Sequence, residues 1–127
     1  MRNALALGLC TLLAVAPLSA ALSAEPLSED KPFAEAHILL QVSDAEAVHH
    51  QATLDIANNL MKHYGGQDMA DIEVIAFGAG VPMLYADNAA TAGRISSLIE
   101  HGVRFYVCGN TMDTIERKQG KRPELQS

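Results

Sequence analysis

Cys108 is the residue of this sequence best suited to covalent chemistry. It follows residues 103–107, an apolar run typical of a buried strand, and a short helix is expected over residues 110–119. A thiol at the amino end of a helix faces unpaired backbone N–H groups and the positive end of the helix dipole, and both favour the thiolate. We therefore expect Cys108 to have a modestly lowered pKa and to react as a nucleophile. The alternative is a buried, inert cysteine, since free cysteine is among the most buried residue types.

Small and polar residues near this thiol are the candidates for shaping its site. Gly109 allows a tight turn and the close approach of a partner sulfur, while Asn110 and Thr111 supply polar groups. Gly78 and Gly80 form a glycine-rich turn after a second apolar run, and we expect them to contact a substrate. This turn lacks the longer glycine pattern and the lysine of nucleotide-binding loops, so a phosphate cradle is disfavoured.

Alternating strand and helix patterns predict the scaffold that positions these residues. Strands are expected over residues 36–42, 72–77 and 103–107. Strand–helix–strand order with short links is typical of a parallel α/β sheet. Open parallel sheets bind ligands beyond the carboxyl ends of their strands. The segments expected to meet at that edge are residues 43–44, 78–80 and 108–110.

Two helices are expected to cover the sheet. Ser43 and Glu46 have the spacing of a capping box, which predicts the start of a helix that ends at the glycine pair 65–66. Its expected inward stripe is Val48, Ala52, Ile56, Leu60 and Tyr64. Thr91 is the expected N-cap of the second helix. The first strand is nearly continuous in apolar residues, which predicts burial on both faces.

The amino terminus has the pattern of a secretory signal peptide. A short positive start containing Arg2 precedes the uncharged residues 4–16, and small residues then lead to Ala24. The apolar run is shorter than the roughly 20 residues that span a bilayer. We expect cleavage after Ala24, export to a bacterial periplasm and no membrane segment in the mature chain. Residues 25–33 form a polar leader to a domain over residues 34–127.

Length, charge and cysteine content narrow the function classes. The chain of 127 residues allows one domain, and its net charge of −6 gives no electrostatic support for binding nucleic acid or an anionic membrane. One of the two cysteines, Cys10, lies in the predicted signal peptide. Cys108 would then be the only thiol of the mature chain in an oxidising compartment, where an unpaired cysteine pairs between chains or reacts.

The segment around the cysteine resembles a known family. Residues 102–112, with the sequence GVRFYVCGNTM, are similar to the cysteine segment of the DsrE/DsrF-like family. Residues 70–80 and the strand-to-helix opening at residues 42–44 support the match, which covers residues 34–123. The resemblance implies a single flavodoxin-like α/β domain that assembles into homo-oligomers, commonly trimers or hexamers. It also implies that Cys108 carries sulfur as a persulfide between donor and acceptor proteins. We expect no cofactor.

The chain departs from the family pattern at its carboxyl end. Relatives continue into another strand and a closing helix, whereas this sequence stops at Ser127. The resemblance therefore implies a domain without its last strand and helix, which would leave apolar surface exposed at a sheet edge unless a neighbour covers it.

Three functions from different classes follow from these features. The first is sulfur transfer through a persulfide on Cys108, and the second is a non-catalytic oligomeric module that binds a small ligand at the same edge. The third is a metal chaperone that uses some of the five histidines and five methionines. No two histidines have the i, i+4 spacing of a helical metal site, so we expect no metal site and solvated histidines on helix faces.

Overall fold

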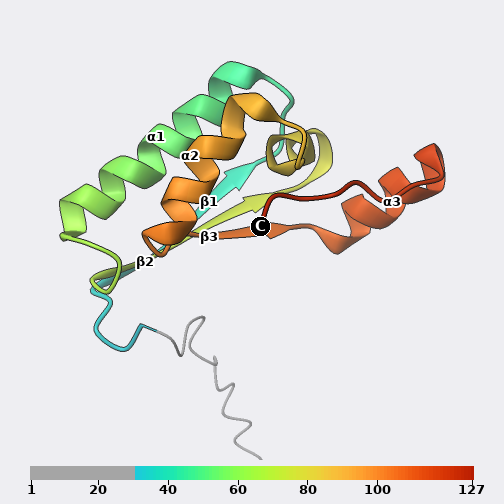
Figure 1. Cartoon of the computed structure of the whole chain (residues 1–127). Coiled ribbons are helices and arrows are strands. Elements are labelled where there is room, and N and C mark those ends of the chain that lie inside the picture. The colour runs from blue at the N-terminus through green and yellow to red at the C-terminus, as the bar shows by residue number, and fades with distance from the viewer. Residues whose placement is uncertain (1–30) are drawn as a thin grey trace, which may run out of the picture.

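Three parallel strands form the sheet, in the order β1-β2-β3, in a computed structural model that describes residues 31–127 (Figure 1). The elements are β1 (Ala36–Val42), α1 (Ala47–Tyr64), β2 (Ala70–Ala76), the 3-10 helix η1 (Gly78–Leu84), α2 (Ala89–Glu100), β3 (Arg104–Val107) and α3 (Gly109–Gln119). This mixed α/β architecture confirms the predicted class and is consistent with a single flavodoxin-like domain. The predicted signal peptide lies outside the described residues.

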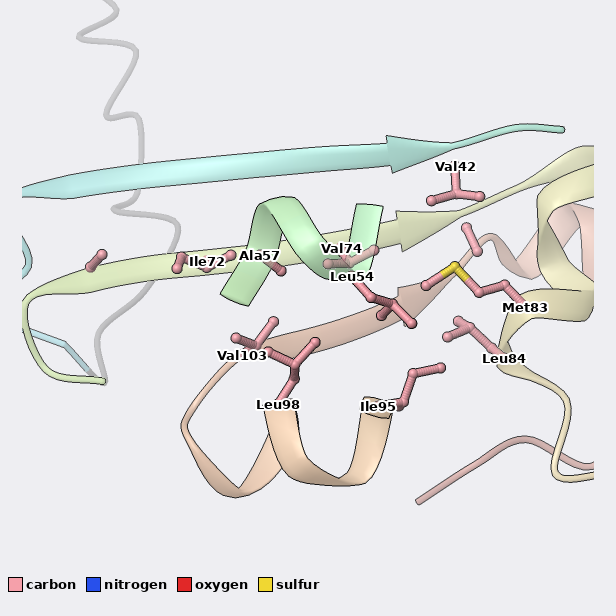
Figure 2. Packing of buried hydrophobic residues seen from close by; sticks show 12 residues of the cluster. Val42, Leu54, Ala57, Ile72, Val74, Met83, Leu84, Ile95, Leu98 and Val103 are labelled. Atoms are coloured by element: carbon pink, nitrogen blue, oxygen red, sulfur yellow. The ribbon is translucent and has the colours of Figure 1, made fainter. Parts of the chain in front are cut away.

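The hydrophobic core lies between the sheet and the two helices α1 and α2, which lie side by side over one of its faces (Figure 1). Parallel pairing sets Val42 opposite Ala76 and Leu40 opposite Val74, so alternate residues of neighbouring strands face the helices together. In Figure 2, Val42 and Val74 lie in the same core as Leu54 of α1 and labelled side chains from α2 and η1. Burial of this shared face orients the carboxyl ends of all the strands toward one edge.

The expectation that the first strand is buried on both faces is wrong. Exposure alternates along β1, and Leu39 is 52% exposed. β1 is an edge strand, and α1 and α2 cover only one face of the sheet, so every second side chain of β1 points away from the core (Figure 1). The exposed face of β1 carries His37, Leu39 and Gln41, so two of its three side chains are polar and the strand is buried on one face only.

The predicted inward stripe of α1 is only partly correct. The buried positions are His50, Leu54 and Ala57, whereas Val48 is 67% exposed and Ile56 is 47% exposed. Strict i, i+4 spacing advances about 40° beyond a full turn at each step, so a stripe drawn that way rotates out of the core. Only its carboxyl-terminal members, Leu60 and Tyr64, pack against the core.

Both predicted helix caps are displaced in the structure. Glu46 is the N-cap of α1, and the carboxylate of Asp44 accepts the Glu46 N–H at 3.0 Å, so Ser43 does not cap the helix. Asn88 caps α2, since its side-chain oxygen accepts the Ala90 N–H. Asp and Asn accept such local bonds readily, which starts each helix from a different residue than predicted.

Thr91, the cap expected for α2, is instead buried inside the fold. Its hydroxyl donates to the carbonyl oxygen of Met83 at 2.7 Å, a bond that links α2 to η1. The residues next to Thr91 in the sequence did not indicate that its hydroxyl would bind the backbone of Met83. This bond gives Thr91 a role in packing rather than in capping.

After α3, the chain returns to the domain rather than adding a strand to the sheet. Leu125 forms an isolated antiparallel bridge with Tyr85. The Ala86 N–H donates to the carbonyl of Glu124, and the Gln126 N–H donates to that of Leu84, both at 2.9 Å. The end of the chain is therefore held against the segment between η1 and α2 (Figure 1).

Gly80 is required by packing at the carboxyl end of β1. A Cβ atom built on Gly80 would lie 2.3 Å from the carbonyl oxygen of Val42, and backbone cannot move away as a flexible side chain would. We expect Gly80→Ala to lower the free energy of unfolding by about 1–3 kcal/mol, the usual cost of overpacking. Urea unfolding would measure it. Gly93→Ala is the matched control, because a Cβ there meets no atom within 4 Å, and an unchanged Gly80→Ala midpoint would contradict the argument.

Candidate functional site

The carboxyl edge of the sheet brings together the ends of all the strands of the described chain. The Cys108 N–H donates to the carbonyl of Ala76 at 3.0 Å, and the Phe77 N–H donates to that of Val42 at 3.0 Å. These bonds place the segments after β1, β2 and β3 next to one another in strand order. The predicted convergence of residues 43–44, 78–80 and 108–110 at one edge is therefore present in the structure.

Cys108 is the N-cap of α3 and its thiol is partly exposed. The backbone N–H of Thr111 and then its hydroxyl, followed by the backbone N–H of Asn110, lower the pKa of the Cys108 thiol. Partial burial and the carboxylate of Asp113 oppose this shift. The direction agrees with the effect expected of a helix amino terminus, where unpaired N–H groups stabilise an anion. The site can therefore hold a nucleophilic thiolate that solvent and a partner can reach.

Thr111 connects the cysteine to the glycine turn after β2. Its Oγ1 accepts a hydrogen bond from the Gly78 N–H at 3.1 Å, across 33 residues of sequence. Because that oxygen is then the acceptor for Gly78, the hydroxyl hydrogen remains available to donate to the sulfur of Cys108, which is the side-chain contact that lowers the thiol pKa. Gly78 thus orients Thr111, and Thr111 polarises the thiol.

The other predicted site residues have different placements. Gly109 and Asn110 are exposed in the first turn of α3, where Asn110 acts through its backbone N–H. Gly78 is exposed and has a φ of +55°, a conformation that favours glycine. Gly80 is buried, and a Cβ there would overlap the carbonyl group of Val42, so packing alone already requires a glycine at this position.

A polar cluster at the end of β1 was missed by sequence reasoning. The carboxylate of Asp44 lies 2.9 Å from Nδ1 of His49, and this bond, followed by the Glu46 N–H, lowers the pKa of Asp44. His50 is buried, and its Nε2 donates to the carbonyl of Asp44 at 2.8 Å. The expectation that all helix histidines are solvated is therefore wrong for His50. The spacing of Asp44 and His49 across the predicted start of a helix was the sequence feature that could have indicated this cluster.

This cluster does not serve Cys108 directly. β1 and β3 are separated by β2, so their carboxyl ends lie about 10 Å apart at the usual strand spacing. A general base must lie within hydrogen-bond reach of the group that it deprotonates. The lowered pKa of the thiol therefore rests on the first turn of α3 and not on a histidine partner. Among residues 31–127, no three histidine, cysteine, aspartate or glutamate side chains come together as ligands for a metal ion.

Thr111→Val is expected to raise the pKa of the Cys108 thiol, because it removes the hydroxyl that donates to the sulfur and keeps the side-chain shape. The pH profile of alkylation by iodoacetamide should move to higher pH, and the rate at neutral pH should fall. Thr111→Ser should restore most of the rate. The control is Thr114→Val, since the Thr114 hydroxyl donates to the carbonyl of Asn110 and does not contact the sulfur. Equal profiles for Thr111→Val and Thr114→Val would contradict this assignment.

Comparison with known proteins supports the fold and gives no information about the activity. No protein-family model matches the chain, and no curated protein matches it. The structure is similar to that of a protein of unknown function from Methanobacterium thermoautotrophicum, with a TM-score of 0.58 and 27% sequence identity. The similarity covers 68% of this chain and 70% of the other. About two thirds of the chain therefore shares its arrangement of strands and helices with a solved archaeal protein.

Proposed function

We propose that this protein carries sulfane sulfur as a persulfide on Cys108, in the manner of the DsrE/DsrF-like family that its sequence resembles. The observation that carries the proposal is the partly exposed thiol at the N-cap of α3, whose pKa is lowered by Thr111 and Asn110. Sulfur transfer needs a thiolate that is accessible to two successive partners, and this position meets both requirements.

The proposed transfer is a pair of nucleophilic displacements. The Cys108 thiolate attacks the outer sulfur of a donor persulfide, forming a new S–S bond as the bond to the donor sulfur breaks and the donor leaves as its thiolate. The thiolate of an acceptor then attacks the outer sulfur on Cys108 and releases the original thiolate. Sulfane sulfur is passed on without external oxidant or reductant. Helix N–H groups stabilise the anionic sulfur of Cys108 at the start and at the end of the cycle.

The test is the intact mass of the reduced, folded protein after incubation with inorganic polysulfide. A gain of the mass of one sulfur atom at Cys108, lost again on addition of a thiol acceptor, is expected. A folded protein that gains no sulfur would overturn the proposal and leave the non-catalytic ligand-binding alternative.

We further propose that the protein is exported and works as a homo-oligomer. Export rests on the signal-peptide pattern of residues 1–24. Oligomerisation is supported by the sheet face opposite α1 and α2, where Leu39 is 52% exposed and Tyr106 is 43% exposed. Among residues 31–127, no helix is long and apolar enough to cross a membrane.

The proposed oligomerisation can be tested directly by measuring the mass of the protein in solution. Light scattering on the purified protein is expected to give a mass of more than one chain. Leu39→Lys should lower that mass, because a charge on this face resists burial against a neighbour. Val48→Lys is the control, since Val48 is an even more exposed apolar residue, and it lies on α1 rather than on this face of the sheet. A stable monomer at micromolar concentration would contradict the proposal.

A further inference from the structure

A groove between α1 and α2 is separate from the cysteine site. It has a volume of about 560 Å³ and lies toward the carboxyl ends of the two helices, which lead into β2 and β3. Since the strands are parallel, the groove lies near the amino edge of the sheet, whereas Cys108 lies at the carboxyl edge. We propose that this groove binds a small organic anion, with an acidic head group and an apolar body.

Basic side chains line the groove, although acidic residues predominate in the whole chain. Its lining includes Lys62, Arg94 and His101, and no acidic residue lines it in the described part of the chain. The net charge of the chain is −6, so basic side chains are the minority and their convergence here is distinctive. An anionic head group would be attracted by Coulomb interactions that a neutral ligand would not have.

Two of the basic groups are available to a ligand. Arg94 is not one of them, because its guanidinium pairs with the carboxylate of Asp55 and donates to the side-chain oxygen of Gln51, which fixes one wall of the groove. His101 Nδ1 lies 2.6 Å from the carbonyl oxygen of Ser97. A carbonyl oxygen only accepts, so Nδ1 carries a proton and Nε2 remains free for a ligand. Lys62 makes no hydrogen bond or ion pair among residues 31–127.

The shape of the groove fits an apolar body behind the head group. Met61 and Leu98 contribute apolar surface, and Gly93 of α2 leaves the space between the helices open, because a Cβ at that position would meet no atom within 4 Å. A volume of this size is in the range of small-molecule sites, which are mostly apolar with a few polar groups that orient the ligand.

Helix capping alone does not account for this arrangement. A lysine in the last turn of α1 interacts favourably with the helix carbonyl ends, which explains a basic residue at position 62. It does not explain two further basic side chains facing the same space, nor a glycine in the middle of α2, where glycine costs about 1 kcal/mol relative to alanine. An open, positively charged groove accounts for both.

The test is a titration of the purified protein with octanoate and with octyl phosphate, followed by NMR or calorimetry. Both anions are expected to bind, and the anion with the higher affinity identifies the preferred head group. Octan-1-ol is expected to bind about ten-fold more weakly or not at all. Lys62→Gln should weaken anion binding by about ten-fold, and Gly93→Leu should abolish it by filling the groove. The matched controls are Lys118→Gln on α3 and Ser96→Leu on the exposed face of α2, which should bind as the original protein does.

Three results would overturn the proposal. These are no binding of either anion, equal binding of octan-1-ol, and binding that Gly93→Leu leaves unchanged. Sulfur uptake on Cys108 serves as an independent readout, because the groove variants lie at the opposite edge of the sheet and should take up sulfur normally. Failure of the groove proposal would therefore be distinguishable from failure of the proposed sulfur chemistry.

Discussion

Cys108→Ser is expected to abolish the gain of sulfur when the exported protein, which by our proposal lacks residues 1–24 and therefore Cys10, is incubated with inorganic polysulfide. A serine hydroxyl stays protonated at neutral pH and does not attack sulfane sulfur, so the loss should be complete rather than partial. The side chain is partly exposed and makes no core contact that the substitution would remove, so the protein should stay folded. Intact mass spectrometry on reduced protein, with circular dichroism as a check of folding, measures both outcomes.

A relocated thiol separates the effect of position from the mere presence of a cysteine. In the same exported form, the double variant Cys108→Ser with Ser96→Cys has its thiol on the exposed face of α2, away from any helix amino terminus. It should take up sulfur much more slowly than the original protein at neutral pH, because nothing there stabilises the thiolate. Equal uptake by the double variant would show that the N-cap position of α3 confers no special reactivity.

The largest loss of stability is expected from Arg104→Met. Asp71 is 1% exposed, and both of its carboxylate oxygens accept from Nη2 of Arg104, at 2.6 and 2.7 Å. Removing the guanidinium leaves a buried carboxylate without its cation, which costs about 3–5 kcal/mol in comparable buried pairs. Urea unfolding at neutral pH should show this loss as a lower midpoint with an unchanged slope.

Two further variants test whether the buried charge causes the loss. Arg104 Nη2 also lies 2.7 Å from the carboxylate of Glu73, so Asp71→Asn and Glu73→Gln combined with Arg104→Met remove all the charges of this cluster and should recover a large part of the stability. Arg122→Met is the matched control, because its ion pairs with Asp113 and Glu116 are exposed to solvent, and the midpoint should hardly move. Equal effects of Arg104→Met and Arg122→Met would refute the role given to burial.

Local sequence was sufficient for the element order and for the position of the thiol. The strands, the helices and the glycine that ends α1 follow from apolar periodicity and turn residues, which are properties of neighbouring positions. The placement of Cys108 between β3 and α3 follows for the same reason. Parallel strands joined by helices then necessarily bring their carboxyl ends to one edge.

Tertiary structure decided which faces and partners these elements have. Packing of the helices against the strands decided which face of α1 is buried and which face of the sheet α1 and α2 cover. It also displaced the helix caps. Periodicity within one helix did not specify these features. The bond from Gly78 to Thr111 and the pairing of Asp71 with Arg104 each join residues 33 positions apart. Such contacts depend on the register between β2 and β3, which is set by packing of the whole core. For this reason the position of Cys108 at the edge of the sheet could be predicted from the sequence, whereas the contacts that lower the pKa of its thiol depend on the folded chain.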